Sequence, residues 1–226
     1  MSAGAKKTEP DVCWFDMDHT LINLDCDVSW KYFAVEHGLA PADAVAEADR
    51  YFADYLAGAL DIAEFLRFQF REFIGKSASE IEALAEAHFE ERVRPRIYPA
   101  ARGLIASLHR RNVPMAILTS TNTAVARPLA RELGIDEVYG CVLEMTGGRC
   151  TGRIVGTYGV GPGKPQIARR VLGARGVTLD RVAYYGDSIN DLPMLEAVGF
   201  PHTVNPSEEL RTAALRRNWP VLRWEL

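Results

Sequence analysis

The sequence predicts an α/β fold: a doubly wound parallel sheet with a helical cap inserted after the first strand. Two observations lead to this prediction. Short apolar runs alternate with helical patterns along most of the chain, as is typical of a parallel sheet with crossover helices. Residues 27–96 interrupt this alternation with helical patterns and no convincing strand. We therefore expect two domains, an α/β core of residues 1–26 and 97–226 and a helical cap domain of residues 27–96.

The expected strands are short apolar runs that end in small or polar residues, a pattern that suits buried strands. They span residues 11–15, 113–118, 181–185 and 202–204. In sheets of this type, ligands bind outside the carboxyl ends of the strands. The polar residues that follow each run are therefore candidate site residues.

The expected helices of the core lie between these runs, and glycines follow three of them as helix ends. They span residues 100–111, 124–133, 165–172 and 191–198, the last three followed by Gly134, Gly173 and Gly199. Residues 138–160 are glycine-rich and alternate weakly, which favours a hairpin or flap.

The block of residues 27–96 contains two patterns typical of capping boxes, Asp61 to Glu64 and Ser77 to Glu80. Between them, one expected helical face carries Ile62, Leu66, Gln69 and Phe73. This spacing predicts that Gln69 points inward rather than into water.

Composition excludes several functional classes. The 226 residues include 48% hydrophobic and 25% charged residues, which is ordinary for a globular protein. The net charge of −4 argues against a nucleic-acid partner, and no apolar run approaches the roughly 18 residues of a membrane span. Residues 1–10 lack the apolar core of a secretory signal and are expected to fray. Four cysteines without a C-x-x-C pair favour reduced thiols in the cytoplasm.

Two aspartates, Asp16 and Asp18, directly follow the first expected strand. Residues at i and i+2 of a strand point to the same side, so their carboxylates would repel each other. Such a pair invites a hard metal ion or acid–base chemistry. The alternative is a solvated strand end at which Thr20 opens a turn.

A second acidic pair, Asp187 and Asp191, follows Gly186 at the end of another expected strand. The alternative interpretation is that Ser188 or Asn190 caps the next helix and that the aspartates favour its N-terminus. A cap needs only one such residue, and this loop holds four polar ones.

Thr119 ends the second expected strand, and Lys164 precedes a helix after a glycine-rich turn. Alone, Thr119 could be an ordinary turn residue and Lys164 a solvated lysine. Together with the two acidic pairs they place a nucleophile, a hydroxyl, a cation and further carboxylates at one edge of the sheet. This combination suits phosphoryl transfer, in which the protein positions a nucleophile and neutralises oxygen charge.

The order of these motifs resembles the haloacid dehalogenase superfamily of phosphohydrolases from about residue 12 to residue 221, and the helical block resembles the cap of its phosphoserine phosphatase-like branch, subfamily IB. The resemblance implies that Asp16 attacks phosphorus to form an aspartyl-phosphate and that Asp18 acts as acid and base. It implies that Thr119, Lys164 and Asn190 contact the phosphate. It also implies that Mg²⁺ is bound by Asp16, the Asp18 backbone carbonyl and Asp187, with support from Asp191.

Three positions bear on the substrate. His19 stands where many relatives have glycine, and it either touches the leaving group or packs beside the loop. Asp25 stands where phosphoserine phosphatases have a glutamate that binds the substrate amine, or it is a capping aspartate. Gln69 aligns with their carboxylate-binding arginine, or it is a satisfied core residue. A neutral glutamine cannot form the bidentate ion pair that a carboxylate favours.

We therefore predict a Mg²⁺-dependent phosphomonoesterase acting on a small-molecule phosphate, with histidinol phosphate as a reasonable substrate because it keeps an amine and lacks a carboxylate. Phosphoserine is the alternative substrate. A phosphate-sensing or partner-binding protein without turnover, and a phosphotransferase, are alternatives of another kind; retention of Asp18 favours catalysis. The sequence predicts no particular oligomeric state.

Overall fold

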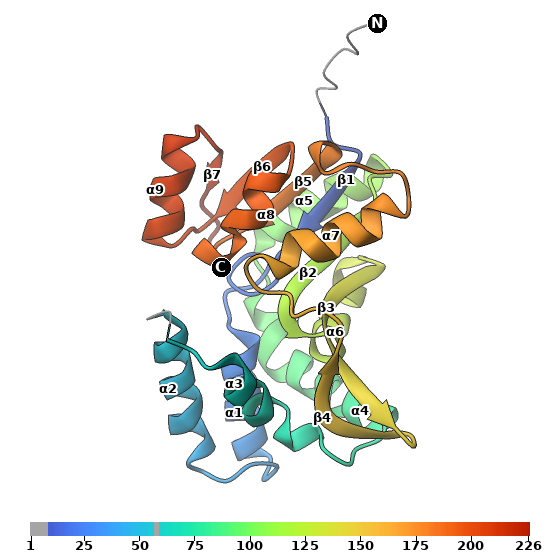
Figure 1. Ribbon diagram of the computed structural model, residues 1–226, viewed down its shortest axis with the longest axis vertical. Coiled ribbons are helices and arrows are strands. Elements are labelled where there is room, and N and C mark those ends of the chain that lie inside the picture. The colour runs from blue at the N-terminus through green and yellow to red at the C-terminus, as the bar shows by residue number, and fades with distance from the viewer. Residues whose placement is uncertain (1–8, 57–58) are drawn as a thin grey trace, which may run out of the picture.

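The computed structural model describes residues 9–56 and 59–226 (Figure 1). Most of the expected tail, residues 1–8, lies outside the described residues. Within the described part, the fold is built on a seven-stranded sheet with the strand order β4-β3-β2-β1-β5-β6-β7. All neighbouring pairs are parallel except the antiparallel pair of β3 and β4. The predicted fold class is confirmed.

The strands and helices have the following bounds. The strands are β1 Val12–Phe15, β2 Met115–Asn122, β3 Glu137–Thr146, β4 Arg149–Val155, β5 Val182–Gly186, β6 Phe200–Val204 and β7 Val221–Leu222. The helices are α1 Cys26–Glu36, α2 Ala44–Leu56, α3 Ile62–Gln69, α4 Ala78–His88, α5 Pro99–Arg110, α6 Thr123–Leu133, α7 Gly163–Gly173, α8 Leu192–Ala197 and α9 Glu208–Arg216.

Successive side chains of β1 enter two different hydrophobic cores, which is why the sheet is wound on both faces. Cys13 and Phe15 pack in the core that contains buried residues of α5 and α6. Val12 and Trp14 pack in the core that contains buried residues of α7, α8 and α9. Because both faces are covered, β1 is apolar throughout and all four of its residues are buried.

Helices α1, α2 and α3 lie beyond the end of the sheet, below it in Figure 1. Ser77 forms the predicted capping box with Glu80, whereas Asp61 only accepts a bond from the Glu64 backbone. The predicted four-residue face is partly wrong. Ile62 is exposed, and α3 ends at Gln69, where Lys31 Nζ donates to the carbonyls of Phe68 and Gln69. Gln69 is buried, as predicted.

The predicted hairpin in residues 138–160 is formed by β3 and β4, which turn through Gly147 and Gly148, both at positive φ. Its second strand is bonded to the helical block through the backbone. Gly75 N donates to Cys150 O at 2.8 Å, and Cys150 N donates to Lys76 O at 2.9 Å. The hairpin therefore joins the edge of the sheet to the inserted helices.

Two predicted helix ends differ by a few residues. Gly134 ends α6 in the left-handed conformation, as predicted. Gly173 is the last residue of α7 rather than its cap, and α8 ends at Ala197, before Gly199. Gly199 meets a steric need instead, since a Cβ there would lie 2.0 Å from Asp180 O. Among the described helices, none is both long and apolar enough to cross a membrane.

Gly159 lies close to the backbone of Thr119 in β2, and this contact leads to a prediction about stability. A Cβ at Gly159 would lie 2.4 Å from Thr119 O, whereas one at Gly173 would meet nothing within 4 Å. Gly159→Ala should lower the free energy of unfolding by about 1–3 kcal/mol, as overpacking does. Gly173→Ala, the control, should leave it unchanged or raise it by up to about 1 kcal/mol. Urea denaturation measures both, and equal stabilities would contradict the packing described.

Candidate active site

A cavity lies between the carboxyl ends of the central strands and helices α1 to α3. Its polar lining includes five carboxylates and one lysine: Asp16, Asp18, His19, Asp25, Asp27, Gln69, Ser120, Lys164, Asp187, Ser188, Asn190 and Ser207. Its apolar lining includes Ala48, Tyr51, Phe52, Leu60, Phe65 and Phe68. The strand ends thus meet an aromatic wall from α2 and α3.

Lys164 is buried at the start of α7 and bonds two of the predicted acids. Its Nζ lies 2.5 Å from Asp16 Oδ1 and 2.6 Å from Asp191 Oδ1, and it donates to Tyr184 Oη at 3.0 Å. Burial lowers the pKa of Lys164, but the Asp16 and Asp191 carboxylates outweigh it and raise the pKa well above its usual value. Lys164 therefore stays charged.

Asp16 is buried at the tip of β1, and its ionisation is finely balanced. Burial raises its pKa to about 7, and the Asp191 and Asp18 carboxylates add to this effect, while Lys164 opposes it. A second cation beside Asp16 would, like Lys164, lower this pKa and favour the charged carboxylate. Lys164 thus holds the Asp16 carboxylate in place.

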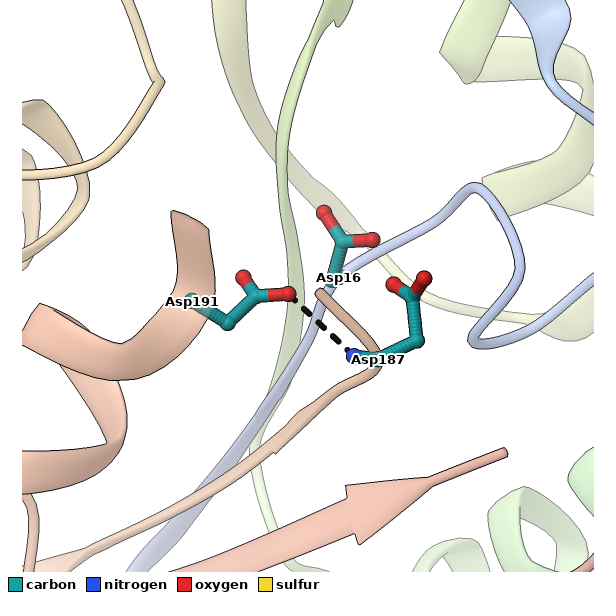
Figure 2. Close-up of side chains that lie close together, drawn as sticks. All are labelled: Asp16, Asp187 and Asp191. Carbon is teal, nitrogen blue, oxygen red and sulfur yellow. Dashed lines mark hydrogen bonds between the residues drawn. The ribbon is translucent and has the colours of Figure 1, made fainter. Parts of the chain in front are cut away.

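Asp16, Asp187 and Asp191 form a compact acidic cluster, in which one carboxylate oxygen from each lies within 4.8 Å of the other two (Figure 2). Thr20 Oγ1 donates to Asp187 Oδ1 at 3.1 Å and fixes its rotamer. Burial raises the pKa of Asp187 well above its usual value, and Asp16 raises it further. Carboxylate oxygens are hard ligands, and a Mg²⁺ ion among them would offset their mutual repulsion. The cluster therefore fits this ion well.

Asp191 differs from the other two because both of its oxygens already accept hydrogen bonds. Lys164 Nζ and Tyr184 Oη donate to Oδ1, at 2.6 Å each. The backbone nitrogens of Asp187 and Ser188 donate to Oδ2, at 3.2 Å each, and Figure 2 shows the first of these bonds. Asp16 and Asp187 are therefore better suited to bind a metal directly, and Asp191 to orient them.

Asp18 is half-buried, and both of its oxygens are oriented by hydrogen bonds. Thr121 Oγ1 donates to Oδ2 at 2.8 Å, and the Cys26 backbone nitrogen donates to Oδ1 at 2.9 Å. Asp18 thus lies where the end of β2 meets the start of α1. Thr121 is not among the predicted site residues, although its position two residues after Thr119 on the same strand places both on one side.

The predicted phosphate-contacting residues are arranged unevenly. Lys164 and Asn190 line the cavity. Thr119 is fully buried, its Oγ1 accepts a bond from the Thr121 backbone, and the neighbouring Ser120 lines the cavity instead. A contact from the Thr119 side chain to phosphate stays a prediction.

The three predicted specificity residues all line the cavity. His19 has a φ of 54°, the left-handed conformation that glycine adopts more easily. Asp25 is the N-cap of α1, accepting a bond from Val28 N at 2.8 Å, so the capping interpretation is correct. Burial raises the pKa of Asp25 to about 6, with Asp18 adding to this shift. Gln69 Nε2 donates to Asp27 Oδ1 at 3.1 Å.

Two further residues of the site were not found from the sequence. Tyr184 lies inside β5 and looked like an ordinary core aromatic, but its hydroxyl bonds Asp191 at the centre of the network. Asp27 lies in the first turn of α1, where an acidic residue is ordinary. Asp25 and Asp27 are two residues apart at the start of α1, and side chains at this spacing do not share a helical face. Nothing in the sequence therefore indicated that both would line the cavity.

Comparison with known proteins identifies the family. The sequence matches the haloacid dehalogenase-like hydrolases over residues 13–196. It is 34% identical over 216 residues to a histidinol-phosphatase of Neisseria meningitidis serogroup C, covering 93% of this chain and 97% of that protein. The chain belongs to the haloacid dehalogenase-like hydrolase family, as the motif order predicted.

Solved structures agree with this assignment. A protein of unknown function from Bordetella pertussis Tohama I superposes with a TM-score of 0.85 at 32% identity, covering 95% of this chain and 99% of that one. A substrate-bound phosphoserine phosphatase superposes with a TM-score of 0.68 at 18% identity, covering 96% and 93%. The second likeness shows a shared fold.

The buried ion network makes a prediction about pH. Lys164→Met should lower the free energy of unfolding at pH 8 by about 3–5 kcal/mol, because it leaves buried carboxylates without their cation. Burial already raises the pKa of Asp16 to about 7 with Lys164 opposing the shift, so without Lys164 this pKa rises still further above its unfolded value. The folded state then binds more protons, and the loss should shrink as the pH falls toward 5.

Urea denaturation at pH 8 and pH 5.5 measures this effect. Lys76→Met removes a lysine outside the cavity and serves as the control, expected to show a small loss at both pH values. A loss in Lys164→Met that is the same at both pH values would contradict the assigned network.

Proposed function

We propose that the protein is a Mg²⁺-dependent phosphomonoesterase that hydrolyses a small-molecule phosphate through an aspartyl-phosphate on Asp16. The observation that carries the proposal is the placement of Asp16. Its carboxylate stands at the tip of β1 in a cavity, bonded by Lys164 and clustered with Asp187. A carboxylate held beside a lysine and further acids suits attack on phosphorus, since charge on the transferring oxygens can be neutralised.

The cation site of the proposal uses the acidic cluster. Asp16, Asp187 and the Asp18 backbone carbonyl would hold Mg²⁺, and Asp191 would keep Asp187 and Lys164 in place through its hydrogen bonds. When bound, the ion supplies positive charge that offsets repulsion between the nucleophile and the phosphate. Lys164 contributes the same kind of compensation from the protein side.

Asp18 is proposed as the general acid and base. The bonds from Thr121 and the Cys26 nitrogen hold its carboxyl group beside the cavity. From there it would give a proton to the leaving oxygen and later take one from the attacking water. Asn190, Thr119 and Lys164 are proposed to contact the phosphate.

Histidinol phosphate is the proposed substrate. The support is the similarity to the Neisseria histidinol-phosphatase, together with a cavity rich in carboxylates that would attract an amine. Phosphoserine is less well matched, because it needs a cation for its carboxylate. Arg71 is bonded to Glu47 and Glu72, and Arg67 is exposed on α3 and does not line the cavity.

The inserted helices are proposed to act as a cap domain of residues 27–96 over a core of residues 1–26 and 97–226. The aromatic residues of α2 and α3 that line the cavity support this role, since a cover of this kind excludes water from the reacting phosphate. The proposed location is the cytoplasm.

The activity is tested by measuring phosphate release from a panel of phosphomonoesters with Mg²⁺ present. Histidinol phosphate should be hydrolysed in preference to L-phosphoserine, Asp16→Asn should release no phosphate above background, and EDTA should stop the wild type until Mg²⁺ is restored. Release by Asp16→Asn at the wild-type rate, or none from any ester, would refute the proposal. A preference for L-phosphoserine would refute the assigned substrate.

Thr121 gives a finer test of the role of Asp18. Thr121→Val removes the hydroxyl that donates to Asp18 Oδ2 while keeping the shape of the side chain. Loss of a hydrogen bond to a charged group should lower kcat about tenfold or more, with KM little changed. The control is Thr178→Val, at an exposed position without a side-chain cap bond. An unchanged kcat in Thr121→Val would show that Thr121 does not position Asp18.

A further inference from the structure

One end of the cavity carries hydrogen-bond acceptors that the proposed chemistry does not use. Asp27, in the first turn of α1, and Gln69, the last residue of α3, both line the cavity. Gln69 Nε2 donates to the Asp27 carbonyl at 3.2 Å and to Asp27 Oδ1 at 3.1 Å. The two side chains therefore form one unit that joins α1 to α3.

The orientation of the Gln69 amide follows from these contacts. Both atoms that face Nε2 are acceptors, so only the amino end of the side chain can face them. The Oε1 atom at the other end is buried and has no hydrogen-bond partner among the described residues. Gln69 is only 1% exposed, and an unpaired buried acceptor of this kind is unfavourable until a donor reaches it.

Lys31 and Glu72 stabilise the end of α3 on the side that does not line the cavity. Lys31 Nζ is fully buried and donates to the carbonyls of Phe68 and Gln69 at 2.7 and 3.2 Å. Its charge is compensated by Glu72 Oε2 at 2.5 Å. Neither Lys31 nor Glu72 lines the cavity.

Aromatic side chains line the same cavity as Asp27 and Gln69. Tyr51 packs against Phe68 with ring centroids 4.9 Å apart and against Phe65 at 5.7 Å. All three rings line the same cavity. Acceptors beside an aromatic wall suit a planar group that carries N–H donors, because its edge can bond the acceptors while its faces meet the rings.

We propose that Asp27 and Gln69 form a subsite that binds an N–H group of a nitrogen heterocycle on the substrate, separate from the Asp25 carboxylate. This inference rests on the proposed function, to which it adds the residues that would recognise the nitrogen ring of the leaving group. The same acceptors repel a substrate carboxylate. Burial raises the pKa of Asp27 well above its usual value, and the Asp25 and Asp18 carboxylates raise it further, so a ligand cation beside Asp27 would relieve this repulsion.

Calorimetric titration of the full-length protein tests the subsite without requiring turnover. L-histidinol carries an amine and an imidazole ring, whereas L-alaninol carries the amine without the ring. Wild-type protein should bind L-histidinol more tightly than L-alaninol. Asp27→Asn should weaken L-histidinol binding about tenfold or more, as loss of a charge-assisted hydrogen bond does, and should leave L-alaninol binding unchanged.

Asp49→Asn, the same change at a residue that does not line the cavity, is the control and should bind both compounds like the wild type. Gln69→Leu removes the free acceptor and should also lose the preference for the ring. Thermal melts show whether each variant is folded. If the variants fail to fold, equal binding of the two compounds by wild-type protein still overturns the proposal, and tighter binding of L-histidinol supports it.

The outcomes for the subsite and for the proposed function are distinct. L-histidinol binding that depends on Asp27, in a protein that releases no phosphate, would support the subsite and contradict the phosphatase. Phosphate release from histidinol phosphate with the same L-histidinol affinity in Asp27→Asn and wild type would contradict only the subsite. Absence of L-histidinol binding to the wild type would also overturn it.

Discussion

The buried bonds of Lys164 are the interaction on which the rest of the site depends. Asp16 and Asp191 come from β1 and from the turn after β5, and both are withdrawn from water. Two buried carboxylates in such proximity would destabilise the fold unless a cation lay between them. Lys164 supplies that cation from the start of α7, so three segments far apart in the sequence are held together by one side chain. Lys164 therefore both positions the proposed nucleophile and stabilises the carboxyl end of the sheet.

The position of this network follows from the two-sided packing of the sheet. Because β1 contributes alternate residues to two cores, it is fixed on both faces, and the residues that follow it have little freedom. Asp16 and Asp18 are thus placed by the rigid centre of the molecule. Asp27 and Gln69, which we propose contact the leaving group, lie instead on α1 and α3, which pack beyond the sheet. The proposed chemistry and the proposed substrate recognition therefore fall to different parts of the chain.

Much of this could be predicted from the sequence, and the reason is local. Asp16, Lys164, Asp187 and Asp191 follow short apolar runs or glycine-rich turns, and parallel strands bring such ends together. What could not be predicted depends on tertiary contacts. The carbonyl of Gln69, the last residue of α3, accepts a bond from Lys31, which lies far away in the sequence. Thr121 has an acidic partner because the neighbouring strand β1 ends near it, and Tyr184 has one because the turn after its own strand brings Asp191 back to its hydroxyl.

The backbone bonds between Cys150 and residues 75–76 have a mechanical consequence. A strand pairs with the inserted block just before α4, so this part of the block cannot move away from the sheet without breaking those bonds or bending the hairpin. Helices α2 and α3 lie at the opposite end of the block, where no comparable backbone bonds to the core strands are found among the described residues. Any widening of the entrance would therefore be a local outward tilt of α2 and α3, pivoting near Gln69, rather than a swing of the whole block.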